Sequence, residues 1–160
     1  MIQYGRTNVL IVRDARADDE AAWRALWAGY LVFYQASVPD DVTAATWARI
    51  LDPHAPIFCR IAVRDGIVAG FAVCVLHAGS WVENPICYLE DLFVDPDQRH
   101  GGVASALIQD LVDLGRSKRW ARLYWHTQSG NAVARRVYDR FTPADDFVKY
   151  EMDLRKGDLG

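Results

Sequence analysis

Two β-rich runs joined by a tight turn constrain the fold of this chain more than any other feature. Residues 57–64 and 67–76 are rich in β-branched and other apolar residues, and the pair Asp65–Gly66 separates them. Asp-Gly between two such runs is the strongest short-range signal for a two-residue β-hairpin. The sequence therefore predicts two neighbouring antiparallel strands at the centre of the chain.

Further strands and helices are predicted on either side of this hairpin from apolar periodicity and from turn residues. In chain order they are a strand over 8–13, a helix over about 18–34, a helix over 41–51, a loop over 77–85 after the hairpin, a strand over 86–94, a helix over 102–119, a strand over 121–127, a helix over 131–140 and a last strand over 147–154. This order predicts a mixed sheet with helices on its faces. The length of 160 residues suits a single domain over residues 1–160, with a core over about 7–154.

The composition excludes several classes of protein. Hydrophobic residues make up 51% of the chain and charged residues 24%, which is typical of a globular domain. The net charge of −3 leaves no basic excess for binding nucleic acid. The longest apolar run near the start is too short for a signal peptide or a membrane span, so we expect a cytoplasmic protein that does not bind membranes. Cys59, Cys74 and Cys87 lie in apolar stretches without C-x-x-C spacing, so we expect buried, reduced thiols and no metal site.

The stretch from Val94 to Leu107 is the most informative about function. It contains a strand end, a Pro-containing turn, Arg99, the adjacent glycines Gly101 and Gly102, and a helix start, in that order. Small residues let the backbone approach a ligand, and the first amide groups of a helix attract anions. The stretch therefore favours a site for a pyrophosphate, although two glycines alone also suit a simple strand-to-helix turn. Neither a P-loop nor a dinucleotide-binding motif is present in the sequence.

The same stretch matches the R-x-x-G-x-A acetyl-CoA signature of the GCN5-related N-acetyltransferases (GNAT). The matching residues are Arg99, Gly102 and Ala104. Residues 131–141 resemble the N-x-x-A-x-x-[LF]-Y block of the same superfamily, and the order of elements agrees along nearly the whole chain. Residues 88–94 (YLEDLFV) also resemble a strand of the diamine and polyamine acetyltransferases and of the fungal histone acetyltransferase-like branch. His100 stands where many members have Gly, a mild departure that should leave the turn intact.

This resemblance implies an α/β (α+β) GNAT fold, with a mixed, mostly antiparallel central sheet of six to seven strands and about four flanking helices. It also implies acetyl-CoA as co-substrate, no metal, and a homodimer, because the last strands commonly pair between subunits. The residues that it implies for CoA binding are Leu92, Phe93, Val94, Arg99, His100, Gly101, Gly102, Val103, Ala104, Ser105, Asn131 and Tyr138. A simpler role for Asn131, compatible with CoA binding, is to cap the helix that follows it.

Acetyl transfer to an amine needs an acid for the leaving thiolate and a base for the amine, and in this superfamily it needs no acyl-enzyme. Tyr138 aligns with the tyrosine of the second block and is the candidate acid, because a phenol with a pKa of about 10 is protonated at neutral pH. Its alternative role is packing at a helix end. By resemblance Glu90 is the candidate base, with Asp91 and His126 as alternatives that could equally be structural. Successive side chains of a strand face opposite sides, so only one of Glu90 and Asp91 should reach the cleft.

By the same resemblance, the first two helices and the loop before the third long strand should cover the acceptor pocket. The predicted acceptor-binding residues are Trp27, Tyr30, Tyr34, Trp81, Glu83, Glu90, Asp91 and His126. Rings with carboxylates suit a cation, but an aromatic stripe at helical spacing is often core, so we expect at least half of these rings to pack. The predicted activity is transfer of acetyl from acetyl-CoA to a primary amine of a small molecule, polyamine or amino acid. The alternatives are a protein lysine or N-terminal acetyltransferase and a non-catalytic acyl-CoA-binding sensor.

Overall fold

A five-stranded sheet runs through the first part of the chain, and its strand order β1-β2-β3-β4-β5 follows the sequence. The computed structural model describes residues 8–155, and the chain divides after His126 into two units. The elements of the first unit are β1 (Leu10–Asp14), α1 (Glu20–Phe33), α2 (Asp40–Leu51), β2 (Ile57–Arg64), β3 (Ile67–Gly79), β4 (Val82–Val94), α3 (Val103–Lys118) and β5 (Arg122–Trp125), with short 3-10 helices η1 (Ala17–Asp19) and η2 (Pro96–Gln98). The second unit contains α4 (Ala132–Tyr138).

The strands β1 to β4 pair with one another antiparallel, in chain order, and β5 pairs with β4 in the parallel direction. Asp65 and Gly66 connect β2 to β3 with φ angles of +49° and +82°. Positive φ at both central residues is the conformation of the hairpin turn that Asp-Gly favours, because its twist matches that of the strands. The predicted hairpin is therefore confirmed, and with it the mixed, mostly antiparallel sheet.

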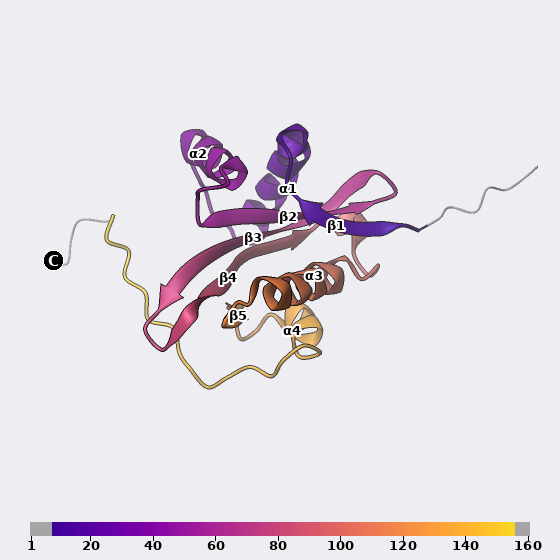
Figure 1. Cartoon of the computed structure of the whole chain (residues 1–160). Coiled ribbons are helices and arrows are strands. Elements are labelled where there is room, and N and C mark those ends of the chain that lie inside the picture. The colour runs from indigo at the N-terminus through magenta and orange to yellow at the C-terminus, as the bar shows by residue number, and fades with distance from the viewer. Residues whose placement is uncertain (1–7, 156–160) are drawn as a thin grey trace, which may run out of the picture. The chain divides into compact units, whose positions relative to one another are not determined.

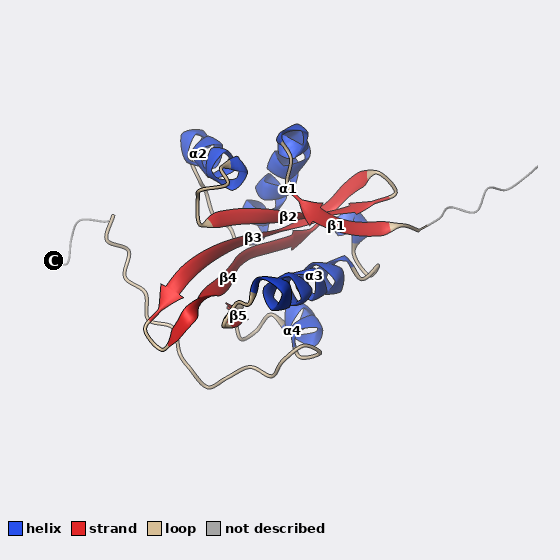
Figure 2. Cartoon of the chain, viewed as in Figure 1, coloured by secondary structure: helices blue, strands red, loops and turns tan. Residues whose placement is uncertain are grey.

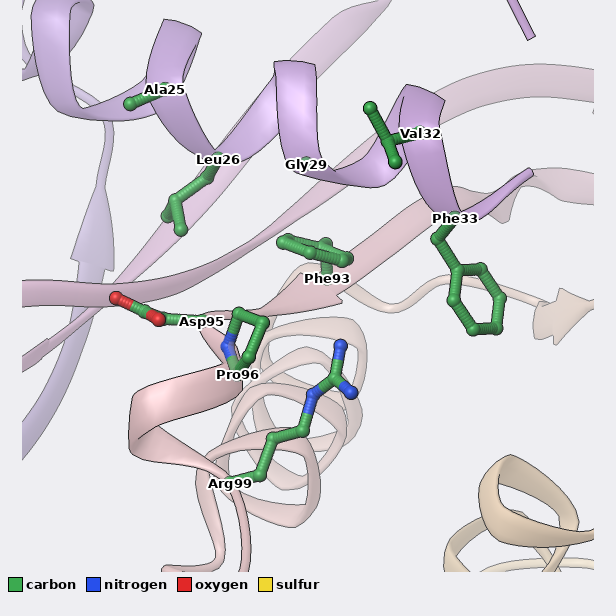
Figure 3. A pocket seen from close by; sticks show the side chains of 9 residues that line it. All are labelled: Ala25, Leu26, Gly29, Val32, Phe33, Phe93, Asp95, Pro96 and Arg99. Atoms are coloured by element: carbon green, nitrogen blue, oxygen red, sulfur yellow. The ribbon is translucent and has the colours of Figure 1, made fainter. Parts of the chain in front are cut away.

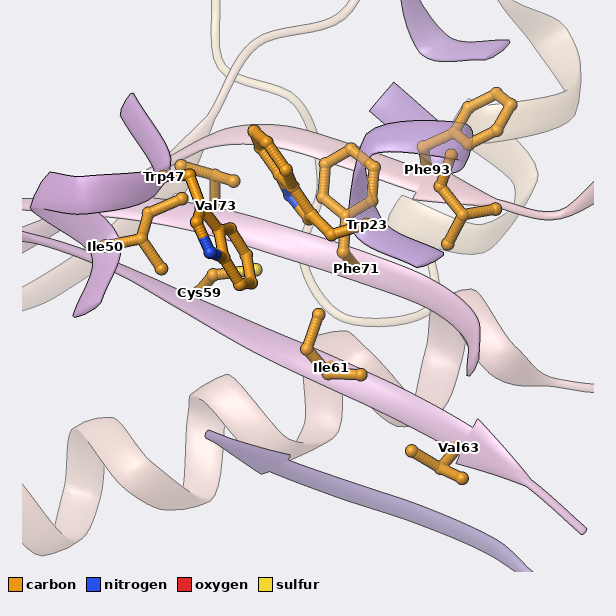
Figure 4. Packing of buried hydrophobic residues seen from close by; sticks show 10 residues of the cluster. Trp23, Trp47, Ile50, Cys59, Ile61, Val63, Phe71, Val73 and Phe93 are labelled. Atoms are coloured by element: carbon orange, nitrogen blue, oxygen red, sulfur yellow. The ribbon is translucent and has the colours of Figure 1, made fainter. Parts of the chain in front are cut away.

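The helices of the first unit lie on both faces of the sheet, with α1 and α2 on one face and α3 on the other (Figures 1 and 2). Trp23 of α1 is fully buried and stacks against Trp47 of α2 at a centroid distance of 4.9 Å (Figure 4). It also stacks against Trp27, one turn further along α1, at 5.4 Å. These rings pack against Phe71 and Val73 of β3 in one hydrophobic cluster. Much of the aromatic stripe of α1 is therefore core, as its helical spacing predicted.

The three cysteines are buried and free, as predicted. Burial raises the pKa of the Cys59 thiol and of the Cys74 thiol above their ordinary value. These thiols therefore stay protonated and serve in packing.

The predicted loop over residues 77–85 is wrong, because strand pairing continues through it. β3 extends to Gly79 and β4 begins at Val82, so the turn contains only Ser80 and Trp81. The register shifts between His77 and Gly79. Such an irregularity accommodates Pro85, which has no amide hydrogen for a regular ladder.

The predicted last strand over residues 147–154 is also wrong for this chain, since these residues pair with no strand in the part of the chain that the structure describes. The sheet therefore has five strands and not six to seven, while the α+β class and the four α-helices are confirmed. Alternating apolar residues predict a strand only if a partner strand supplies the hydrogen bonds, and here their side chains are exposed. Among residues 8–155, no helix has the length and apolar character needed to cross a membrane.

Candidate functional site

The connection from β4 to α3 forms the candidate anion site. It passes through η2 and Arg99, and then His100 and Gly102 adopt positive φ angles of +63° and +77°. α3 begins at Val103 without a side-chain cap, so no capping side chain occupies the amide groups of its first turn. These amides and the helix dipole suit a phosphate group. Histidine is among the residue types that tolerate the left-handed region best, which explains how the turn accommodates His100 in place of Gly.

A cavity of about 460 Å³ adjoins this connection, between α1 and the end of β4 (Figure 3). Its lining residues are Ala25, Leu26, Gly29, Val32, Phe33, Phe93, Asp95, Pro96 and Arg99. The guanidinium carbon of Arg99 lies 5.7 Å from the ring centroid of Phe93. A Cβ atom at Gly29 would lie 3.1 Å from the Phe93 ring, so the missing side chain keeps this part of the cavity open. The structure thus brings the predicted residues Phe93 and Arg99 together at one cavity large enough for part of a ligand.

One edge of β4 is open next to this cavity. β5 pairs with β4 only from Ile86 to Leu89, while residues 92–94 pair with β3 on their other side. Among the described residues, no strand pairs with 92–94 on the β5 side. Unpaired amide and carbonyl groups at a strand edge can hydrogen-bond an extended ligand, so this edge suits the predicted role of residues 92–94.

A β-bulge in β4 decides which carboxylate faces α1. Leu89 pairs with Cys74 and Asp91 with Val73, so Glu90 is the extra residue of the bulge. Directly paired residues share a face of the sheet, so Asp91 lies on the face of Val73. That face is the one covered by α1. Glu90 itself is exposed.

Asp91 is hydrogen-bonded to Tyr30 of α1, whose hydroxyl donates to its carboxylate at 2.6 Å. Burial raises the pKa of Asp91 to about 6 and the charge of Glu90 adds to this, while the hydrogen bond from Tyr30 lowers it. Tyr30 stacks on Trp27 at 5.2 Å and contacts Tyr34 at 4.8 Å between centroids. Tyr30 thus links the predicted acceptor-binding rings Trp27 and Tyr34 to a half-buried carboxylate, which takes up a proton more readily than an exposed one.

His126 lies in a cluster of rings that the sequence reasoning missed. Its Nδ1 lies 3.3 Å from the hydroxyl of Tyr88, and Tyr88 stacks on Tyr124 of β5 at 5.0 Å. The hydroxyl of Tyr124 in turn lies 3.0 Å from Nε2 of His77. Tyr88 and Tyr124 are paired residues of β4 and β5, so knowledge of the register would have revealed this cluster.

Trp81 and Glu83 are not brought to the Tyr30–Asp91 pair. Both lie at the turn between β3 and β4, and Trp81 is 87% exposed. Glu83 and Asp91 are eight positions apart along β4, which corresponds to roughly 25 Å. The reason is the unforeseen length of the β3–β4 hairpin.

Asn131 and Tyr138 belong to the second unit. The side-chain oxygen of Asn131 accepts a hydrogen bond from the amide of Ala134 at 3.3 Å, so its capping role is confirmed. Tyr138 is the last residue of α4. The roles of both residues toward CoA stay predictions.

Comparison with known proteins assigns the family. The model of the acetyltransferase (GNAT) family matches residues 20–142, which is most of the chain and includes both sequence motifs. The chain belongs to the GNAT family. This GNAT protein is therefore an acyltransferase of the N-acetyltransferase type, and its α+β sheet is that of the family.

Individual relatives of this GNAT protein act on small amines. It is 29% identical to the D-amino-acid N-acetyltransferase HPA3 of Saccharomyces cerevisiae, over 89% of each chain. It is 30% identical to the aminoglycoside N(6')-acetyltransferase type 1 of Salmonella typhimurium, over 72% of this chain and 79% of that one. The solved structure of the aminoglycoside N-acetyltransferase AAC(6')-Iy in complex with CoA superposes with a TM-score of 0.76, at 24% identity, over 92% of this chain and 97% of that one.

Proposed function

We propose that this protein transfers the acetyl group of acetyl-CoA to a primary amine of a small molecule. The observation that carries the proposal is the Tyr30–Asp91 pair, a half-buried carboxylate on β4 directly before the open strand edge at residues 92–94. An anion site follows at the end of the same strand. One strand thus presents, in order, a base, a backbone edge for an extended thioester and a site for its phosphates.

Acetyl-CoA binding would use this strand and the connection to α3. Residues 92–94 would hydrogen-bond the pantetheine arm, and the turn from Arg99 to Ser105 would hold the pyrophosphate through its amides and the guanidinium of Arg99. The structurally similar AAC(6')-Iy forms a complex with CoA, which supports CoA as the ligand. Asn131 and Tyr138 are proposed to contact CoA because they match the second family motif.

The reaction needs one base and one acid. The amine nitrogen attacks the thioester carbonyl carbon, a C–N bond forms, and the C–S bond breaks to release the CoA thiolate. Because the acceptor binds as an ammonium, its nitrogen first loses one proton to Asp91, which passes it to water, and it loses a second proton by the same route as the C–S bond breaks. The pKa of Asp91, about 6, leaves this carboxylate ionised at neutral pH yet makes it a stronger base than an exposed carboxylate. Glu90, exposed at the bulge, and His126 remain the alternative bases, directly or through water. The thiolate takes its proton from Tyr138.

The acceptor would be a small amine, a polyamine or an amino acid. An acceptor ammonium would pair with the Asp91 carboxylate and contact the neighbouring rings of Tyr30 and Tyr34, because carboxylates pair with cations and rings attract them. The relatives that act on D-amino acids and on aminoglycosides support this class of acceptor.

We also propose that the protein is a cytoplasmic homodimer. The support for a dimer is the segment 147–154, whose residues Val148, Tyr150, Met152 and Leu154 are 65–92% exposed. These apolar residues alternate along the chain, as in a strand that pairs with a partner. Sedimentation velocity would give the mass in solution, and a monomer would contradict the proposal.

Two measurements test the proposed activity. Acetyl-CoA should raise the melting temperature, because a ligand that binds only the native state stabilises it by RT ln(1 + [L]/Kd). A screen of amines, amino acids and peptides with acetyl-CoA should release free thiol with small amines. A melting curve unchanged by saturating acetyl-CoA would refute cofactor binding. Thiol release with peptides alone would indicate a protein acetyltransferase, and binding without any turnover would indicate a sensor.

A further inference from the structure

Arg64 reaches from the end of β2 to the connection that forms the anion site. It is the last residue of β2, directly before the Asp65–Gly66 turn. Its guanidinium donates to the backbone carbonyl oxygen of Gln98 at 3.5 Å and to that of Gly101. One cation therefore binds two carbonyl groups of a loop that lies more than thirty residues further along the chain.

Gly101 is the residue that permits this contact. A Cβ atom at Gly101 would lie 2.2 Å from Nη1 and 2.5 Å from Nη2 of Arg64, far inside the contact distance. Gly101 is not among the glycines with a positive φ angle, so its backbone conformation does not require glycine. The absence of a side chain at this position serves the close approach of Arg64.

The direction of these carbonyl groups determines where the amides of the loop point. In a trans peptide the carbonyl of one residue and the amide of the next point in opposite directions. When Arg64 holds the oxygens of Gln98 and Gly101, the amides of Arg99 and Gly102 are turned away from Arg64. His100, between them, has a left-handed conformation that is unfavourable for a residue other than glycine. Such a loop keeps its shape only when neighbouring groups hold it.

We infer that Arg64 is a positioning residue for CoA binding, which holds the carbonyl oxygens of the loop so that its amides face the pyrophosphate. Arg64 acts through the loop and not on the reacting atoms. The inference rests on the proposed function, since the ligand of the loop is the pyrophosphate of CoA.

The first experiment measures CoA affinity by calorimetry, together with KM and kcat. Arg64→Met keeps the length of the side chain and removes the donors, so Kd for CoA and KM for acetyl-CoA should rise about ten-fold, the size of losing a charged hydrogen bond. The value of kcat at saturation should stay within about two-fold of wild type, because the reacting groups are untouched. Arg64→Lys should lie in between, because an ammonium keeps the charge but not the planar fork. Arg116→Met is the matched control, because Arg116 is an exposed cation on α3 and its loss changes the net charge equally.

The second experiment uses the contact at Gly101. Gly101→Ala should displace the Arg64 guanidinium and weaken CoA binding about as much as Arg64→Met. The double variant should bind no more weakly than either single variant, because both remove one interaction. All variants should melt within a few degrees of wild type.

Three results would overturn the inference: wild-type CoA affinity in Arg64→Met, no effect of Gly101→Ala, or losses that multiply in the double variant. A loss confined to kcat would equally contradict positioning of CoA. If the wild-type protein itself fails to bind CoA, the proposed function falls, and the inference falls with it.

Discussion

Replacing Asp91 with asparagine should make this protein more stable at pH 8. Burial raises the pKa of Asp91 from 3.8 in the unfolded chain to about 6 in the folded one. The folded state therefore holds this proton more tightly, and stability falls as the pH rises from about 4 to 6, then stays at the lower level. Asparagine resembles the protonated form and can still accept the hydrogen bond from Tyr30.

The expected gain follows from the shift in pKa. Two pKa units correspond to about 3 kcal/mol, since each unit is 1.36 kcal/mol. Asp91→Asn should therefore raise the free energy of unfolding by up to about 3 kcal/mol at pH 8. Near pH 4 the carboxyl is largely protonated in the folded state, so most of the gain should disappear. The same substitution should abolish acetylation if Asp91 is the base.

Urea unfolding at pH 8 and pH 4 measures both values, and comparing the variant with wild type at each pH cancels the titration of all other groups. Asp113→Asn is the control, because Asp113 is an exposed carboxylate on α3. Its effect should stay within about 0.5 kcal/mol at either pH. An Asp91→Asn protein that is no more stable than wild type at pH 8, or that is equally stabilised at both pH values, would refute the argument from burial.

Two further substitutions test the CoA site and the acid. Gly102→Glu should abolish the acetyl-CoA-induced rise in melting temperature, because its carboxylate would repel the pyrophosphate. Gly102→Ala is the control: it has the same unfavourable φ angle of +77° but carries no charge, so it should keep most of the rise. Tyr138→Phe should lower turnover by about a hundred-fold or more and leave CoA affinity within a few-fold, as measured by thiol release and calorimetry. Near-normal turnover in Tyr138→Phe would leave water or His126 as the acid.

The elements of the fold could be predicted from the sequence because their signals are local. The Asp65–Gly66 turn, the apolar spacing of α3 and the Asn131 cap each depend on neighbouring residues, and all three are confirmed. The predicted strand over 147–154 depends instead on a partner, which alternation alone does not supply.

The site was harder to predict because it depends on register. Strict alternation in β4 would have placed Asp91 on the same face as Leu89, in the core beneath α3. The bulge puts it on the opposite face, against Tyr30. Arg64 was missed for a similar reason, since its contact with Gly101 joins segments that no local pattern connects.

The bulge at Glu90 also shows how one strand can serve two surroundings at the cost of a single unpaired residue. Before it, Cys87 and Leu89 alternate into a dry interior, and after it the phase of alternation is reversed. Asp91 pairs with Val73 and Leu89 with Cys74. A chain that lacked Glu90 would therefore keep both pairings, and each later residue of β4 would stay on the same face of the sheet. It would lose the local bend of β4 that accompanies a bulge. The inserted residue stands directly after Leu89, where the pairing of β4 with β5 ends, so the bend of the bulge coincides with the point at which β4 leaves β5.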